Sequence, residues 1–141
     1  MSYLLDTCVL SELVRPAPDP GVVKWARAHD ELEMYISVLT IGELTRGVEK
    51  LGKSRRKEQL RRWLEHDLSE RFKGRVLPVD SSVAAAWGAM TAAAERVGVT
   101  VPAVDGLIAA TAAVAGLAVV TLNVADMQAT GVRLVNPWSS G

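Results

Sequence analysis

The chain of 141 residues is long enough for one domain, and 49% of its residues are hydrophobic, enough for a sizeable core. Sixteen acidic residues balance sixteen basic ones, which excludes a strongly basic or acidic protein. The single cysteine excludes a disulfide within the chain. We see no secretory signal before the first acidic residue, Asp6, and expect a cytoplasmic domain spanning residues 1–141.

Short apolar segments alternate with helical patterns along the chain. We expect strands at residues 3–5, 34–38, 76–79 and 118–121, with a last edge strand at 134–135. The patterns between them predict helices at residues 9–14, 20–28, 40–51, 55–71, 81–97 and 102–115. This alternation predicts an α/β fold with three layers, α/β/α, around a central parallel sheet of four to five strands.

One uncharged stretch, residues 106–125, has the length of a membrane span. Alanine dominates it, Gly116 interrupts it, and its character changes at residues 117–121. We therefore interpret it as a buried helix, a turn and a buried strand, and expect no membrane segment.

Three carboxylates stand at the ends of apolar segments, and each has a structural explanation. Asp6 could cap the helix that follows it, and Glu43 could form a capping box with Thr40. Asp105 lies in the first turn of its helix, where it would complement the helix dipole. None of these roles excludes a functional one, because ligands bind at the carboxyl ends of the strands in such sheets.

A fourth candidate is the loop at residues 123–126, where Asn123 and Asp126 could equally form an ordinary Asx turn. Right-handed winding places the first strand beside the fourth, so this loop would meet Asp6 and Asp105 at one rim. Carboxylates that close together need a cation, and oxygen ligands favour Mg²⁺ or Mn²⁺ over zinc. Neither histidine has ligand spacing, and we expect both at the surface.

Five short motifs occur in order and cover nearly the whole chain. They are LLDT at residues 4–7, ELTRG at 43–47, DGLIAATA at 105–112, VTLNVAD at 120–126 and NPW at 136–138. Together they resemble the PIN-domain family, specifically the VapC-like toxins of type II toxin–antitoxin systems. Each motif alone is weak, but the set is specific.

The resemblance implies a Mg²⁺-dependent endoribonuclease that inhibits growth by cleaving RNA. The family's acids map to Asp6, Glu43, Asp105 and, in the last loop, Asp126 or Asn123. Small hydroxyl residues that support the site map to Thr7 and Thr121.

For the mechanism, we expect Asp6 and Asp105 to hold the metal, directly or through water, with Mn²⁺ as a substitute. Glu43 would orient or deprotonate the attacking water, helped by Asp126. Three positions depart from the family's pattern. Cys8 replaces the usual Asn and would alter hydrogen bonds behind the site, and Leu122 replaces a frequent Arg and removes a phosphate or orienting contact. Asn123 replaces an acid, which leaves the metal count open and favours one Mg²⁺ over two.

A basic cluster at residues 50–62 is the best electrostatic footprint for RNA. The candidate RNA-binding residues are Arg46, Lys53, Arg55 and Arg56. The alternative is a solvated helix face, because Glu58 and Glu65 offer partners at helical spacing. We interpret the four tryptophans as core or interface anchors rather than base-stacking platforms.

The resemblance also implies partners. A cognate antitoxin would cover the active site, and DNA would be bound only through it. The alanine-rich segments 84–94 and 109–115 suggest a homodimer surface, or tight packing within one domain. Two alternatives from other classes are a receiver-like signalling module, which lacks its paired acids here, and a catalytically weak or silent PIN-fold protein that binds RNA or an antitoxin.

Overall fold

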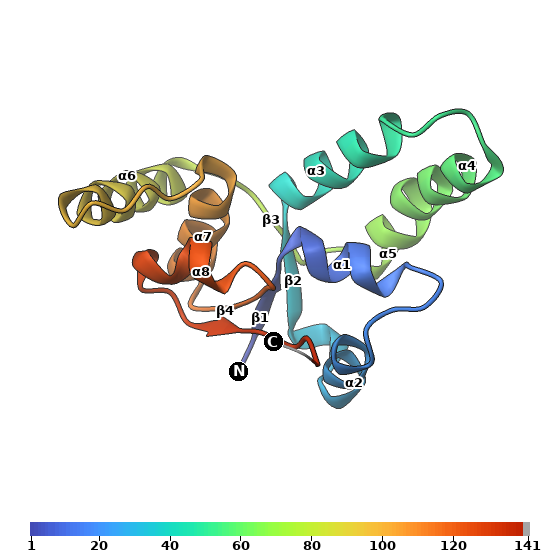
Figure 1. Cartoon of the computed structure of the whole chain (residues 1–141), viewed down its shortest axis with the longest axis horizontal. Coiled ribbons are helices and arrows are strands. Elements are labelled where there is room, and N and C mark those ends of the chain that lie inside the picture. Colours follow the sequence, from blue (N-terminus) through green and yellow to red (C-terminus); the bar gives the residue numbers. More distant parts are fainter. Residues whose placement is uncertain (140–141) are drawn as a thin grey trace.

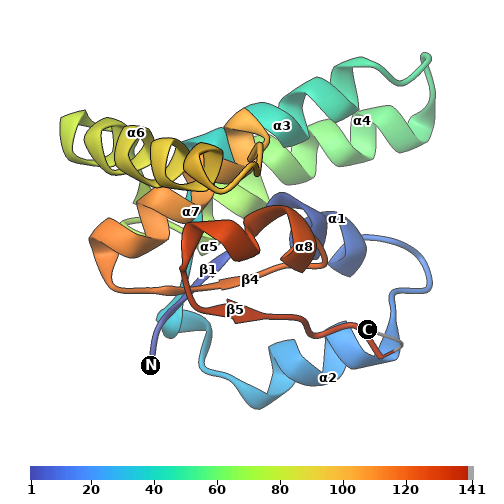
Figure 2. The same cartoon turned by 60° about the vertical axis from the view of Figure 1, so that its left-hand side comes forward.

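The computed structural model describes residues 1–139, so residues 140 and 141 of the expected domain lie outside the described residues. Five strands form a parallel sheet in the order β3-β2-β1-β4-β5. They are β1 (Tyr3–Leu5), β2 (Met34–Ser37), β3 (Val76–Leu77), β4 (Ala118–Val120) and β5 (Leu134–Val135). Helices cover both faces of this sheet (Figures 1 and 2). The predicted α/β/α architecture and the adjacency of the first and fourth strands are confirmed.

The helices follow the predicted order. Their bounds are α1 (Thr7–Leu13), α2 (Pro20–Ala28), α3 (Val38–Glu49), α4 (Arg55–Arg62), α5 (Ser69–Arg71), α6 (Ser81–Arg96), α7 (Ala103–Ala115) and α8 (Val124–Met127). Three short turns of other helix types are η1 (Glu31–Glu33), η2 (Trp63–Leu68) and η3 (Gln128–Thr130). The predicted long helix at residues 55–71 is therefore divided by η2, a π-helical turn that turns Leu64 and Leu68 into the core.

The sheet separates two hydrophobic cores because side chains alternate between its faces. Leu5 and Val120 pair in register and join the core beneath α1, α2, α3 and η2. Leu4 and Val119 pair in register and join the smaller core beneath α7 and α8. Both central strands are thus buried on both faces, which fixes the position of the residues that follow them.

The start of α3 differs from the prediction. Ser37 caps this helix, because its Oγ accepts a hydrogen bond from the Leu39 N–H at 3.0 Å. The helix therefore begins at Val38, and Thr40 lies inside it. The expected capping box between Thr40 and Glu43 is wrong, and Glu43 is free for another role.

The uncharged stretch at residues 106–125 is not one helix. Gly116 adopts a left-handed conformation, with φ of 72°, and ends α7 before β4 begins. Within residues 1–139, no helix is both long and apolar enough to span a membrane.

One histidine departs from the expectation of a surface position. His29 is half-buried, stacks on Trp25 with ring centroids 4.3 Å apart, and meets Tyr3 edge-on at 5.1 Å. His66 is exposed, as predicted.

Candidate active site

Asp6 lies where β1 ends and α1 begins, and its side chain is almost fully buried. Its Oδ1 accepts a hydrogen bond from the Thr7 N–H at 2.8 Å, so the predicted cap is real. Its Oδ2 accepts one from the Thr121 hydroxyl at 2.7 Å. Burial raises the pKa of Asp6, and these hydrogen bonds oppose that rise. The same carboxylate therefore serves as a helix cap and borders the cavity described below.

Thr7 connects Glu43 to this end of the sheet. The Thr7 hydroxyl donates to Glu43 Oε1 at 2.6 Å, and the Thr40 hydroxyl lies 3.1 Å from it. Glu43 projects from the exposed side of α3, where a helix cap is not its task. The contact fixes a carboxylate of α3 against the first turn of α1.

Among the predicted site residues, Asp105 has the pKa that differs most from its ordinary value. Partial burial, and then the negative charges of Asp6, Asp126 and Glu43, raise its pKa to about 6. The four carboxylates come from four separate segments, and each of the other three raises the pKa of Asp105. The predicted convergence of Asp6, Asp105 and the loop after β4 agrees with the cavity described next, which Asp6, Asp105 and Asn123 line.

A cavity of about 430 Å³ opens at this edge of the sheet. It is lined by Asp6, Thr7, Cys8, Ser11, Glu12, Arg15, Glu43, Asp105, Leu122, Asn123 and Trp138. Asp126 does not line it. That residue is exposed on the first turn of α8, although its charge reaches Asp105.

The loop after β4 is fastened to Asp6 through Thr121. The buried Thr121 hydroxyl donates to Asp6 and accepts the Asn123 N–H at 2.8 Å. Cys8 Sγ lies 3.7 Å from both Asp6 Oδ2 and the Thr121 hydroxyl. Burial and the neighbouring Asp6 charge raise the pKa of the Cys8 thiol, so it stays neutral. The supporting positions predicted at residues 7, 121 and 123 all border the site.

Sequence reasoning missed four residues that line the cavity: Ser11, Glu12, Arg15 and Trp138. A signal for three of them was present. Residues 8, 11, 12 and 15 are spaced i, i+3, i+4 and i+7, which places them along one face of α1 and the turn after it. Trp138 has no such signal, because only the folded path of the last segment brings it there.

The donor chemistry of the site fits a hard divalent cation. Its predicted ligands are carboxylate oxygens, and burial followed by the neighbouring negative charges raises the pKa of Asp105. Within residues 1–139, no three Asp, Glu, His or Cys side chains stand close enough to hold an ion by themselves. Mg²⁺ usually keeps several waters and takes only one or two carboxylates, so a site with two protein ligands, such as the predicted pair Asp6 and Asp105, would fit it.

The basic cluster lies away from the cavity. Arg46, Lys53 and Arg55 are exposed and do not line it. Arg56 donates to the Val14 carbonyl at 2.9 Å and so ties α4 to the end of α1. Arg61 pairs with Glu58, as the solvated-face interpretation expected, and also with Glu49 of α3, which it did not. Part of this charge is therefore engaged in holding the helices together.

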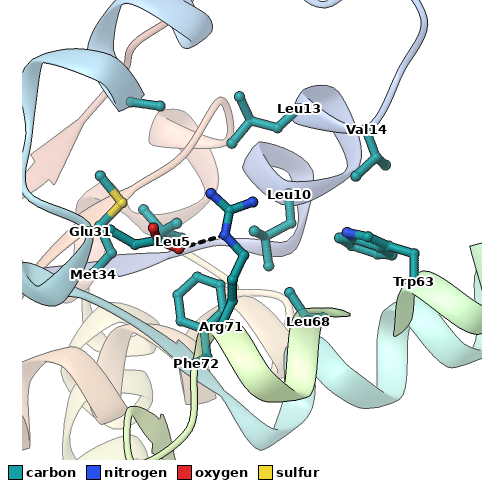
Figure 3. A pocket seen from close by; sticks show the side chains of 11 residues that line it. Leu5, Leu10, Leu13, Val14, Glu31, Met34, Trp63, Leu68, Arg71 and Phe72 are labelled. Atoms are coloured by element: carbon teal, nitrogen blue, oxygen red, sulfur yellow. Dashed lines mark hydrogen bonds and ion pairs between the residues drawn. The ribbon is translucent and has the colours of Figure 1, made fainter. Parts of the chain in front are cut away.

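A second cavity, of about 160 Å³, is apolar and lies between α1, α2, η2 and α5 (Figure 3). It is lined by hydrocarbon and aromatic side chains such as Leu68 and Phe72, with the ion pair of Arg71 and Glu31 across it at 2.6 Å. It holds none of the predicted site residues. We therefore place the candidate chemistry in the acidic cavity.

Residues 3–129 match the family described as "PIN domain", and the chain belongs to that family. It is 38% identical over 135 residues to Toxin FitB of Neisseria gonorrhoeae, covering 96% of this chain and 97% of that protein. It is 33% identical over 135 residues to VapC ribonuclease Y4jK of Sinorhizobium fredii, covering 96% of each.

Solved structures agree. FitAcB from Neisseria gonorrhoeae matches with a TM-score of 0.93 and 38% identity, over 97% of this chain and 99% of that one. DNA-bound VapBC from Salmonella typhimurium matches with a TM-score of 0.77 and 28% identity, over 96% and 97%. The resemblance to the PIN-domain family and its VapC-like toxins is confirmed.

Proposed function

We propose that this protein is a Mg²⁺-dependent endoribonuclease and the toxin of a type II toxin–antitoxin pair, which arrests growth by cleaving RNA. The observation that carries the proposal is that Asp6, Glu43 and Asp105 line one cavity at the edge of the sheet. Burial, and then the charges of Asp6, Asp126 and Glu43, raise the pKa of Asp105 there to about 6. The names of the relatives, a toxin and a VapC ribonuclease, support the same activity.

Each predicted site residue has a role in phosphodiester hydrolysis. Asp6 and Asp105 would hold Mg²⁺, or Mn²⁺ in its place, and the ion would supply charge neutralisation at the phosphate and a more acidic bound water. Glu43, oriented by Thr7, would position or deprotonate the attacking water. Asp126 would add negative charge behind Asp105, while Thr121 keeps Asp6 in place.

Purified protein tests the activity directly. We expect cleavage of RNA in Mg²⁺, none in EDTA, and loss of both cleavage and growth arrest in Asp6→Asn or Asp105→Asn. Asp67→Asn is the matched control, because Asp67 is exposed on η2 and lines neither cavity. Full activity in folded Asp6→Asn and Asp105→Asn would sink the assignment. Binding of RNA without any cleavage would favour the catalytically silent alternative.

We also propose a cognate antitoxin that covers the acidic cavity and supplies any DNA binding. A groove of about 260 Å³ adjoins this cavity, shares Thr7, Ser11 and Glu43 with it, and continues over apolar side chains of α3 and α4. The similar VapBC structure is a pair bound to DNA. Co-expression with the neighbouring reading frame should yield a complex in which RNA cleavage is suppressed.

Homodimer formation is a further proposal. The small side chains Ala84, Ala85, Ala89, Ala92 and Ala93 are exposed on α6, whose other side packs on α7 (Figure 1). Small residues permit close approach of a second copy. Light scattering of the purified chain should give twice the monomer mass, and Ala89→Glu should reduce it to the monomer.

A further inference from the structure

One wall of the acidic cavity is built by residues outside the carboxylate cluster. Among the described residues that line the cavity, Arg15 is the one cation. Its side chain is 66% exposed, and its Nη1 donates to Glu12 Oε1 at 3.2 Å. An arginine has five N–H donors, so this single contact orients the guanidinium and leaves most of its donors for a ligand.

Glu12 holds the other residues of this wall in place. Its side chain is only 11% exposed, and its second oxygen accepts the Asp19 N–H at 2.9 Å. One carboxylate oxygen therefore holds the arginine, while the other holds the loop that leads into α2. An exposed ion pair ordinarily leaves its arginine mobile. Here the buried, doubly bonded acid holds Arg15 at the cavity.

Asp19 in turn fastens the end of the chain to this wall. Its carboxylate accepts the Ser139 N–H at 3.0 Å and the Ser139 hydroxyl at 2.7 Å. Gly21 permits the close contact, since a Cβ there would lie 2.5 Å from the Pro137 carbonyl oxygen. The chain after β5 consequently runs to the loop between α1 and α2 (Figure 2). Trp138 thereby becomes part of the cavity lining.

We propose that Arg15 and Trp138 form a nucleotide subsite for single-stranded RNA, an inference that rests on the proposed ribonuclease activity. Arg15 binds a phosphate next to the scissile one. Trp138, which the sequence suggested as a core or interface anchor, does pack against the core, but it is only half-buried and also lines the cavity, where it stacks on the base of that nucleotide. RNA is repelled by four carboxylates, so a cation inside the same cavity is where its backbone can be held. A base that stacks on protein must first leave its helix, which selects unpaired RNA.

The phosphate contact is tested with Arg15→Gln and Arg15→Lys. For a single-stranded RNA, Arg15→Gln should raise KM about tenfold and change kcat about twofold or less, and Lys should restore part of the loss. In a Glu43→Gln background, where RNA stays intact, the slope of log Kd against log salt should fall by about 0.7. Arg96→Gln is the matched control, because it removes one charge at the end of α6, a helix that does not line the cavity.

The stacking contact is tested with Trp138→Leu and Trp138→Phe. Leucine keeps an apolar side chain against the core but cannot stack, so binding of single-stranded RNA should weaken about fivefold to tenfold. Phenylalanine should retain most of the affinity. A fully paired RNA of the same sequence should compete poorly with the single-stranded RNA for binding to the wild-type protein.

The nucleotide subsite and the ribonuclease activity can fail independently of each other. If wild type cleaves RNA while folded Arg15→Gln keeps its KM and salt slope, the subsite is overturned and the ribonuclease stands. If Trp138→Leu and Trp138→Phe bind alike, the base does not stack there, and that half of the subsite is overturned. If wild type neither binds nor cleaves RNA, both proposals fall.

Discussion

The apolar cavity and the acidic cavity meet two consecutive residues at the end of β1, yet their linings differ in charge and polarity. Leu5 lines the apolar pocket, and Asp6 lines the acidic one. In the apolar pocket, Glu31 is neutralised by Arg71 at 2.6 Å. In the acidic cavity, Asp6, Glu43 and Asp105 share the lining, and the lone arginine among the described lining residues is bound to a fourth acid, Glu12. Paired charge accompanies packing, whereas unpaired like charge marks the place where a ligand is needed.

The largest expected effect separates function from packing at the strand end. Asp6→Asn should lower RNA cleavage at least about 100-fold. Its free energy of unfolding at neutral pH should not fall, because burial of Asp6 already disfavours the charged form that Asn replaces. Initial cleavage rates and urea unfolding measure the two quantities. A variant that loses stability and activity together would contradict the contrast.

The reverse result is expected in the apolar pocket. Leu68 is 1% exposed there, and Leu68→Ala should lower the free energy of unfolding by about 2–5 kcal/mol. Cleavage per folded molecule should be unchanged at a temperature where the variant is folded. Denaturant unfolding followed by activity normalised to the folded fraction tests this. Loss of specific activity in the folded variant would show that the two cavities are coupled.

Thr121 links the buried core to the acidic cavity, because its buried hydroxyl donates a hydrogen bond to Asp6. Thr121→Val keeps the shape but removes the donor to Asp6 Oδ2 and the acceptor of the Asn123 N–H. We expect a loss of about 1–3 kcal/mol of stability. The Thr121 hydrogen bond lowers the pKa of Asp6, so its removal should move the acid limb of the pH–rate profile to higher pH. Thr91→Val on α6 is a control that removes a hydroxyl bonded only to its own helix.

The raised pKa of Asp105, caused first by burial and then by neighbouring negative charges, has a pH signature in the absence of metal. The pKa of Asp105 is raised from 3.8 to about 6 in the folded chain. Between these pH values the folded state therefore binds more protons than the unfolded state does. The contribution of Asp105 to the free energy of unfolding consequently falls as pH rises from about 4 to 6. The difference between wild type and Asp105→Asn in EDTA should show this decline. A difference that does not vary over that range would contradict it.

The smallest effects are expected in the basic cluster. Lys53→Gln or Arg55→Gln should change KM for RNA about twofold or less at physiological salt, and more at low salt, because these exposed charges act at a distance. Kinetics at two ionic strengths measure this. An effect as large as that of Arg15→Gln would move the main RNA contact from the cavity to α4.

The fold was predictable because β1 and β4 are short, apolar and separated by helical patterns. Asp6 and Asp105 were predictable for the same reason, since strand ends and helix starts have clear local signals. The start of α3 was predicted wrongly because Ser37 and Thr40 are both good caps, and only the hydrogen bond to Leu39 chooses between them. Trp138 could not be assigned to the cavity, because its place depends on bonds across 120 residues between Ser139 and Asp19.

The hydrogen bond between Asp6 and Thr121 joins residues 115 positions apart. Synthesis begins at the end that carries Asp6, so a growing chain holds that carboxylate long before its partner exists. β1 likewise lacks its neighbour β4 until residues 118–120 have been made. The acidic cavity can therefore be assembled only after residues 118–121 have been made. No growing chain that ends before residue 121 contains both partners of the hydrogen bond that holds Asp6 in place.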